Sequence, residues 1–222
     1  LPRHLSLRYP MEVNLWGDSR TTLAALLPLL HQSDDLSWQE EVASGMAEWD
    51  AVTEREAMVP ADPINPRFVF HHLNEQLPHD VIITADAGST ADWYGHHIKL
   101  GREMMGSLSG RLATMIGAMP YATAAKFAYP ERPVVCTIGD GAFQMLGMNG
   151  LLTVKRHWRE WENPVLVVVV LHNDDLNQVS WEMRQAGDPR WDTAQLVEDM
   201  NYARFAEGLG LRGIRVEDPA EV

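Results

Sequence analysis

The sequence predicts an α/β fold in which a doubly wound parallel sheet carries helices on both faces. The runs Pro133–Ile138 and Val165–Leu171 are continuously apolar rather than alternating, which is typical of strands buried on both faces of a parallel sheet. Strand-like and helix-like segments also alternate from residue 64 onward, which favours repeated strand–helix units. Ligands of such sheets bind at the carboxyl ends of the strands, so the turns after these runs form the candidate site.

Composition limits the classes of protein. The chain of 222 residues has one cysteine, Cys136, and a formal net charge of −13. The charge disfavours nucleic acid as a partner, because no basic stripe exists to neutralise phosphates. No apolar run approaches the ~20 residues of a membrane span. Leu1–Leu5 leads into no signal-peptide core and the single cysteine fits a reducing compartment, so we expect a cytoplasmic protein without membrane contact.

The first 63 residues are predicted to hold a strand, a helix and a connection. Met11–Trp16 alternates and predicts a strand, and Asp18 or Ser19 is expected to cap a helix that runs to Leu30. An acidic helical stretch and a proline-rich segment follow, and proline cannot continue a helix. The expected organisation is residues 1–30, a linker region 31–63 and a main domain 64–222. Because the sequence does not begin with Met, we expect a fragment of a longer protein, truncated at its C-terminus.

The main domain is predicted to begin with a helix that Asn65 caps and Pro66 opens. Its further elements follow from hydrophobic periodicity. Strands are expected at Val81–Ala85, Val134–Ile138, 165–171 and Leu211–Val216, and helices at Leu112–Ala128, Phe143–Trp158, Asn177–Arg184 and Asn201–Gly210.

Polar or glycine-rich turns follow three of the predicted strands, at Asp86–Thr90, Gly139–Gly141 and Asn173–Asp175. Each turn alone has a conformational explanation, because Gly and Asp are common in turns. Together, at one edge of a sheet, they indicate a ligand site. Asp140 and Asn173 offer hard oxygen ligands, and the glycines expose backbone amides, which suits Mg²⁺ carrying a diphosphate.

The turn Gly139-Asp140-Gly141-Ala142-Phe143, followed by a helix, an apolar strand and Asn173, resembles the diphosphate-binding motif of thiamine diphosphate enzymes. Thr114–Pro120, Trp181–Gly187 and Asn201–Val222 resemble the matching stretches of the acetolactate synthase and pyruvate oxidase branch. The resemblance covers roughly residues 64–222, and residues 1–30 resemble the end of that family's middle domain.

The resemblance implies that Asp140, Asn173 and the backbone carbonyl of Asp175 bind Mg²⁺. It also implies that the bulky Met115 lies under the cofactor and bends it, although ordinary helix packing is the alternative for this residue. The remaining cofactor-binding positions that it implies are Gly88, Ser89, Thr90, Gly139, Gly141, Ala142 and Phe143.

For the whole protein, the resemblance implies decarboxylation of a 2-keto acid such as pyruvate, with acetolactate or acetate as the product, and it leaves FAD open as a further cofactor. The activating glutamate is expected in an N-terminal pyrimidine-binding domain of a partner subunit, within a homodimer or homotetramer. No catalytic residue is therefore assigned to this chain.

Two features depart from the family pattern. His172 occupies a position where many members have Asn, and Arg156–Asn163 lengthens the span from Asp140 to Asn173. The metal site can survive the longer span, because loops accept insertions at little cost. His172 and the absence of the N-terminal domain keep open a non-catalytic module that retains the fold and serves assembly or ligand binding. A Mg²⁺-dependent phosphohydrolase with Asp140 as nucleophile needs several converging carboxylates, and only Asp86 offers a second.

Overall fold

The computed structural model describes residues 5–222, which form two compact units that divide between Glu48 and Trp49. In the first unit Asp18 caps helix α1 (Ser19–Leu26), because its side chain accepts a hydrogen bond from the Thr21 N–H. The predicted strand at Met11–Trp16 is wrong: this segment is irregular. An alternating pattern makes a strand only when a neighbouring strand satisfies its backbone groups.

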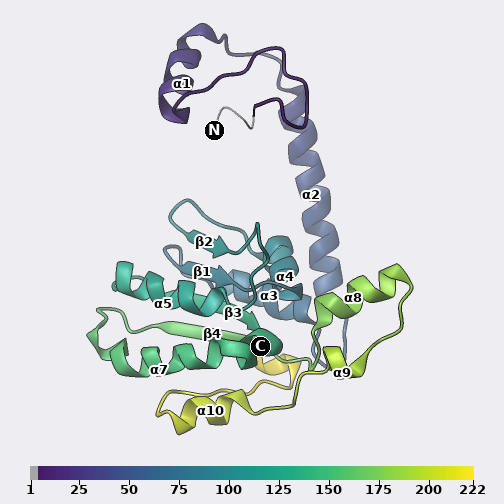
Figure 1. The fold of residues 1–222 in the computed structure, drawn as a ribbon, viewed down its shortest axis with the longest axis vertical. Helices are drawn as coiled ribbons and strands as arrows, with labels where there is room; N and C mark the ends of the chain where they lie inside the picture. The colour runs from purple at the N-terminus through teal and green to yellow at the C-terminus, as the bar shows by residue number, and fades with distance from the viewer. Residues whose placement is uncertain (1–4) are drawn as a thin grey trace. The chain divides into compact units, whose positions relative to one another are not determined.

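The second unit is built on a parallel sheet with the strand order β2-β1-β3-β4 (Figure 1). Ile82 of β1 pairs with Met105 of β2 and with Val134 of β3, and Val134 pairs with Leu166 of β4. The strands are β1 (Ile82–Ala85), β2 (Met105–Leu108), β3 (Val134–Gly139) and β4 (Leu166–Leu171).

Helices cover both faces of this sheet. The side chains of Ile82, Val134 and Cys136 pack with α5 and α7, whereas those of Ile83 and Val135 pack with α3 and α4 on the opposite face. The predicted fold class, a doubly wound α/β sheet, is thereby confirmed. The helices are α2 (Ser37–Ala57), which crosses the division between the units, α3 (Pro66–Gln76), α4 (Ser89–His97), α5 (Ala118–Ala128), α6 (Asp140–Ala142), α7 (Met148–His157), α8 (Asn177–Ala186), α9 (Asp192–Gln195) and α10 (Tyr202–Gly208).

A buried lysine fastens one end of the sheet. Lys126, near the end of α5, is fully buried, and its Nζ donates hydrogen bonds to the backbone carbonyls of Pro130, Arg132 and Asn163 at 3.2, 2.6 and 2.6 Å. These carbonyls belong to the segments that lead into β3 and β4. The ammonium group thus joins a helix end to the entrances of two strands.

Several element boundaries differ from those predicted. The helix expected from Leu112 begins only at Ala118, because Ala113 and Ile116 have positive φ angles of 45° and 71° and interrupt it. The helix expected from Phe143 opens with α6 and a π-helical turn, η3 (Phe143–Gly147). The strand expected at Leu211–Val216 is irregular, and β2 was not predicted, because Met-Gly-Ser-Leu shows no apolar run.

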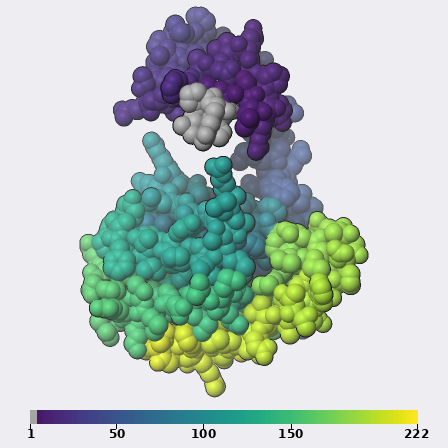
Figure 2. Space-filling view, in the orientation of Figure 1, coloured from purple at the N-terminus to yellow at the C-terminus, as the bar shows by residue number. Residues whose placement is uncertain are grey.

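The C-terminal segment lies against the α5–α7 side of the unit. Tyr202, Phe205 and Leu209 of α10 and its C-cap pack on the apolar cluster under that face. In Figure 2 the yellow surface of this segment adjoins the green surface of earlier parts of the second unit. No helix in the described part of the chain, residues 5–222, combines the length and the apolar character that a membrane span requires.

Candidate functional site

The three predicted turns lie at the same edge of the sheet. Asp86 follows β1, Asp140 follows β3 and His172 follows β4, and these three strands are neighbours in the order β1-β3-β4. The turns also touch. A Cβ atom built on Gly139 would lie 3.6 Å from Oγ1 of Thr90, and the Asp140 carboxylate binds the turn after β4.

Asp140 is the centre of this edge, with only 2% of its surface exposed. Its Oδ2 accepts the N–H groups of Asn173 and Asp174 at 2.8 and 2.6 Å, and its Oδ1 accepts the N–H of Gly141 at 2.7 Å. Burial raises the pKa of the Asp140 carboxyl, and the hydrogen bonds from these amides oppose that shift. The carboxylate therefore fixes the turn after β4 by its backbone, whatever side chains that turn carries.

The free acceptor capacity of Asp140 suits a cation. An ionised carboxylate offers about four lone-pair sites. The three amides occupy both sites of Oδ2 and one of Oδ1, which leaves one site on Oδ1. Asn173, whose N–H the Asp140 carboxylate binds, adds an amide oxygen in the same turn, so the residues present offer the hard oxygens that Mg²⁺ prefers and fit the predicted metal.

The other two predicted metal ligands lie in the turn after β4. The Oδ1 of Asn173 accepts the N–H of Asp175 at 3.1 Å, so the Asn side chain folds back on its own turn. The carboxylate of Asp175 accepts a hydrogen bond from the hydroxyl of Ser180 at 2.8 Å and is thus bound to α8. The group of Asp175 predicted to bind metal is its backbone carbonyl, and that stays a prediction.

His172 lies in a group that the sequence did not predict. Its Nε2 is 2.7 Å from Oδ1 of Asp174 and 3.3 Å from Oδ1 of Asp199, and its ring packs edge-on against Tyr202. Ligand atoms of Asp140, His172 and Asp174 lie within 4.8 Å of one another. The adjacent pair Asp174-Asp175 was a signal for Asp174, but nothing in the sequence placed Asp199 beside it.

The turn after β1 offers backbone amides at the start of α4, in addition to the buried carboxylate of Asp86. Gly88 has a φ of 84°, which L residues rarely adopt, and it precedes Ser89 and Thr90 in the first turn of α4. The first N–H groups of a helix have no partner within it, and they attract anions. Thr90 is buried beside Gly139, so two of the predicted diphosphate turns are in contact.

The remaining predicted residues divide by burial. Ala142 and Phe143 are buried in the core, so only their backbone can face a ligand. Gly141 has close neighbours, because a Cβ on it would lie 2.6 Å from Cδ2 of Leu176. Met115 lies in the irregular turn before α5, partly buried against the core. Met115 thus packs against the core from a turn and not from a helix, and its role under the cofactor stays a prediction.

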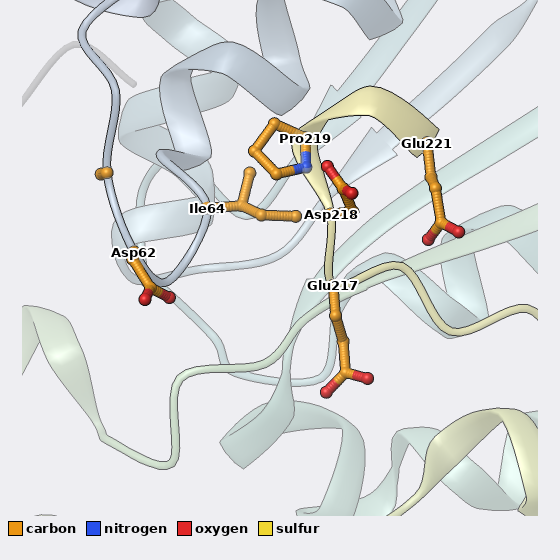
Figure 3. A pocket seen from close by; sticks show the side chains of 7 residues that line it. Asp62, Ile64, Glu217, Asp218, Pro219 and Glu221 are labelled. Carbon is orange, nitrogen blue, oxygen red and sulfur yellow. The ribbon is translucent and has the colours of Figure 1, made fainter.

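One hollow of the second unit is lined by other residues than these (Figure 3). It has a volume of about 490 Å³ and is open to solvent. Its carboxylates would repel a diphosphate, and it contains none of the predicted site residues. It is lined by Ala61, Asp62, Ile64, Glu217, Asp218, Pro219 and Glu221.

The comparisons with known proteins agree on one family. The family model described as thiamine pyrophosphate enzyme, C-terminal TPP binding domain, matches residues 86–222. The putative thiamine pyrophosphate-containing protein YdaP of Bacillus subtilis (strain 168) is 28% identical over 221 residues, which are 100% of this chain and 37% of that protein. The acetolactate synthase isozyme 2 large subunit of Escherichia coli (strain K12) is 29% identical over 212 residues, 96% of this chain and 36% of its own length.

A solved structure shares the fold. The Rhodococcus jostii RHA1 thiamine diphosphate-dependent 4-hydroxybenzoylformate decarboxylase superposes with a TM-score of 0.65 at 21% identity. The match covers 75% of this chain and 30% of that one. The chain thus spans well under half the length of the proteins that it matches.

Proposed function

We infer a function from the family to which this chain belongs, that of the thiamine pyrophosphate enzymes, of which it carries the C-terminal TPP-binding domain. We propose that the chain holds the diphosphate of thiamine diphosphate together with Mg²⁺, in an enzyme that decarboxylates a 2-keto acid such as pyruvate. The observation that carries this proposal is the buried Asp140 carboxylate, which binds the turn after β4 and keeps one acceptor site free.

Each part of the site has a separate task in this proposal. Asp140, the amide oxygen of Asn173 and the carbonyl of Asp175 hold the metal. The amides at the start of α4 and that of Ala142 bind phosphate oxygens, whereas the N–H groups of Gly141 and Phe143 already donate to Asp140. Met115 supports the rings. When bound, the cofactor supplies the reactive carbon that adds to a keto acid and the electron sink that decarboxylation requires.

The chain is proposed to need a partner for turnover. The curated relatives are longer, and the resemblance locates the activating glutamate in an N-terminal domain of a partner subunit, within a homodimer or homotetramer. FAD enters the proposal only as a further cofactor of the whole protein. We therefore expect the isolated 222 residues to bind cofactor and metal without turning over pyruvate.

Calorimetric titration with thiamine diphosphate in the presence of Mg²⁺ tests the proposal. Asp140→Ala removes the metal ligand and should weaken binding about 100-fold, the upper range for changes around a metal site. Asp188→Ala, an exposed aspartate, is the matched control and should bind as the unmodified chain does. Equal binding by the Asp140 and Asp188 variants would contradict the site. Binding by a whole protein that never decarboxylates a keto acid would instead identify a non-catalytic module.

A further inference from the structure

A second buried carboxylate lies at the same sheet edge, and the proposed function gives it no task. Asp86, directly after β1, is 1% exposed. Its Oδ1 accepts the N–H of Ile116 at 2.8 Å, and its Oδ2 accepts the N–H of Ala118 at 2.9 Å. Among the described residues it forms no ion pair with a basic side chain. Its Oδ1 also accepts the N–H of Ala87, in its own turn, at 3.0 Å. The carboxylate therefore joins its own turn to the one before α5, and Met115 lies inside the latter.

The turn has a conformation that local sequence does not favour. Ala113 and Ile116 have φ angles of 45° and 71°. A β-branched residue at positive φ is a clear outlier, and such strain persists only where surrounding contacts enforce it. The Asp86 carboxylate binds the N–H of Ile116 itself, so it acts at the strained residue.

Asp140 repeats this arrangement on the neighbouring strand. Asp174, with a φ of 54°, is a further positive-φ residue, and its N–H is bound by Asp140. At both strand ends a buried carboxylate thus holds the amide of a residue in the left-handed region. Asp140 fixes in this way the turn that carries Asn173 and Asp175, and Asp86 fixes the turn that carries Met115.

We propose that Asp86 is a positioning residue, whose carboxylate holds Ile116 at positive φ and so sets the position from which Met115 supports the cofactor. The inference rests on the proposed function for the role of Met115, but the hold on the turn can be tested without it. Without the carboxylate, Ile116 relaxes toward negative φ and the peptide that joins it to Met115 rotates.

The alternative role for the Asp86 carboxylate is that it only caps α5, since Ala118 begins that helix. Thr84 provides the matched control, because its hydroxyl donates to the carbonyl of Ala118 at 2.9 Å and leaves the N–H of Ile116 untouched. Asp86→Asn keeps the size of the side chain but removes its charge and turns an NH₂ group toward at least one of the three amides that the carboxylate binds. Thr84→Val therefore disturbs the same helix end without disturbing the strained residue.

Amide hydrogen exchange in the isolated chain, read on residues 114–118, tests the hold on the turn. Asp86→Asn should raise the exchange rate at Ile116 at least tenfold, and Thr84→Val should leave it within threefold. Unchanged exchange in Asp86→Asn, or equal acceleration in both variants, overturns the proposal. This measurement tests whether Asp86 holds the turn even if the unmodified chain fails to bind thiamine diphosphate. Failure to bind would count against the proposed function alone.

Kinetics of the natural full-length protein, loaded with thiamine diphosphate and Mg²⁺, test the positioning. Asp86→Asn should lower kcat about tenfold or more and change the KM for the keto acid less than threefold, because misplacement acts on the reacting geometry. Ile116→Gly removes the strain, since glycine adopts positive φ freely, so the double variant should recover most of the lost kcat. If Asp86 only capped α5, adding Ile116→Gly would not restore kcat. Absence of recovery, or failure of the double variant to fold, overturns the positioning role.

Discussion

Asp140 and Lys126 are buried charges that the backbone stabilises. Three N–H groups converge on the carboxylate, and three carbonyls converge on the ammonium. Such hydrogen bonds to charged groups contribute about 1.5–3 kcal/mol each, and removing the charge leaves buried partners unsatisfied. Substitution at either residue therefore affects the segments around it as well as the residue itself.

The variant Lys126→Met tests whether the buried ammonium group stabilises the segments around it. The variant leaves the carbonyls of Pro130, Arg132 and Asn163 without their donor, so we expect the free energy of unfolding to fall by about 3–5 kcal/mol. Urea unfolding monitored by circular dichroism measures it. Lys155→Met, on the exposed side of α7, is the control and should change stability by less than about 0.5 kcal/mol. Similar losses in the two variants would show that Lys126 has no such role.

His97 makes stability depend on pH. It is 5% exposed, and its Nε2 has no hydrogen-bond partner among the described residues. Burial, with Arg67, His96 and His71 nearby, lowers the pKa of His97 to about 4. The unfolded chain binds a proton at this residue below about pH 6.5, whereas the folded chain stays neutral, so stability from His97 is full above that pH and is lost as pH falls toward 4.

The comparison of His97→Gln with the unmodified chain isolates this effect. Gln takes up no proton, so between pH 7.5 and pH 5 the unmodified chain should lose about 1–2 kcal/mol more stability than the variant. Urea unfolding at both pH values gives the four free energies. Equal losses in the two proteins would assign the pH dependence to other groups.

At the scale of elements, the sheet edge depends on close contact between short segments. Gly141, in α6, touches the segment after β4, because a Cβ on it would lie 2.6 Å from Cδ2 of Leu176 and 3.3 Å from Cγ2 of Val197. Gly141→Ala forces these side chains apart, which costs about 1–3 kcal/mol in a packed region. The displaced segment carries the predicted metal ligands.

We therefore expect Gly141→Ala to weaken cofactor binding about tenfold in the presence of Mg²⁺, the equivalent of about 1.4 kcal/mol. Calorimetry measures it. Gly95→Ala is the matched control, because nothing lies within 4 Å of a Cβ at that helical position. If the two glycine variants bind alike, the contact with Leu176 does not define the site.

Elements with a strong periodic signal were predicted well, and those shaped by distant contacts were not. β3 and β4 follow from their apolar runs, and Asn65 does cap α3. The start of α5 was misplaced because Asp86, some 30 residues away, fixes the backbone there. No local pattern carries that information. β2 is a short strand at the edge of the sheet, where the demand for apolar side chains is weak.

The candidate site shows the same division. Topology predicted that the three turns meet, because parallel strands deliver their carboxyl ends to one edge. It could not predict which side chains bond to which backbone groups there. The groups around His172 and the bonds of Asp86 therefore appear only in the structure.

At the scale of the whole molecule, charge opposes the proposed ligand. The chain has a formal net charge of −13, and thiamine diphosphate is itself anionic at its diphosphate. Affinity must then come from the local metal and amides, against a repulsive field that salt screens beyond about 10 Å at 0.1 M.

Removal of the metal tests this balance. Chelation of Mg²⁺ should weaken thiamine diphosphate binding about 100-fold, and added KCl should then strengthen the residual binding, because it screens repulsion. Thiamine, which lacks the diphosphate, is the control ligand and should not gain affinity with KCl. Titration calorimetry at two salt concentrations measures both. Binding that is indifferent to chelation would contradict a metal-dependent site.

The pairing of a buried carboxylate with the amide of a strained residue has a consequence for how this edge can vary. Since Asp86 and Asp140 each hold a turn by its main chain, part of the shape of those turns does not depend on their side chains. Position 172 can then change through evolution, or in a randomised library, while the loop keeps its course, whereas position 174, with a φ of 54°, favours Asp, Asn or Gly. New ligand specificities would then arise from single substitutions that leave the backbone of the loop unchanged.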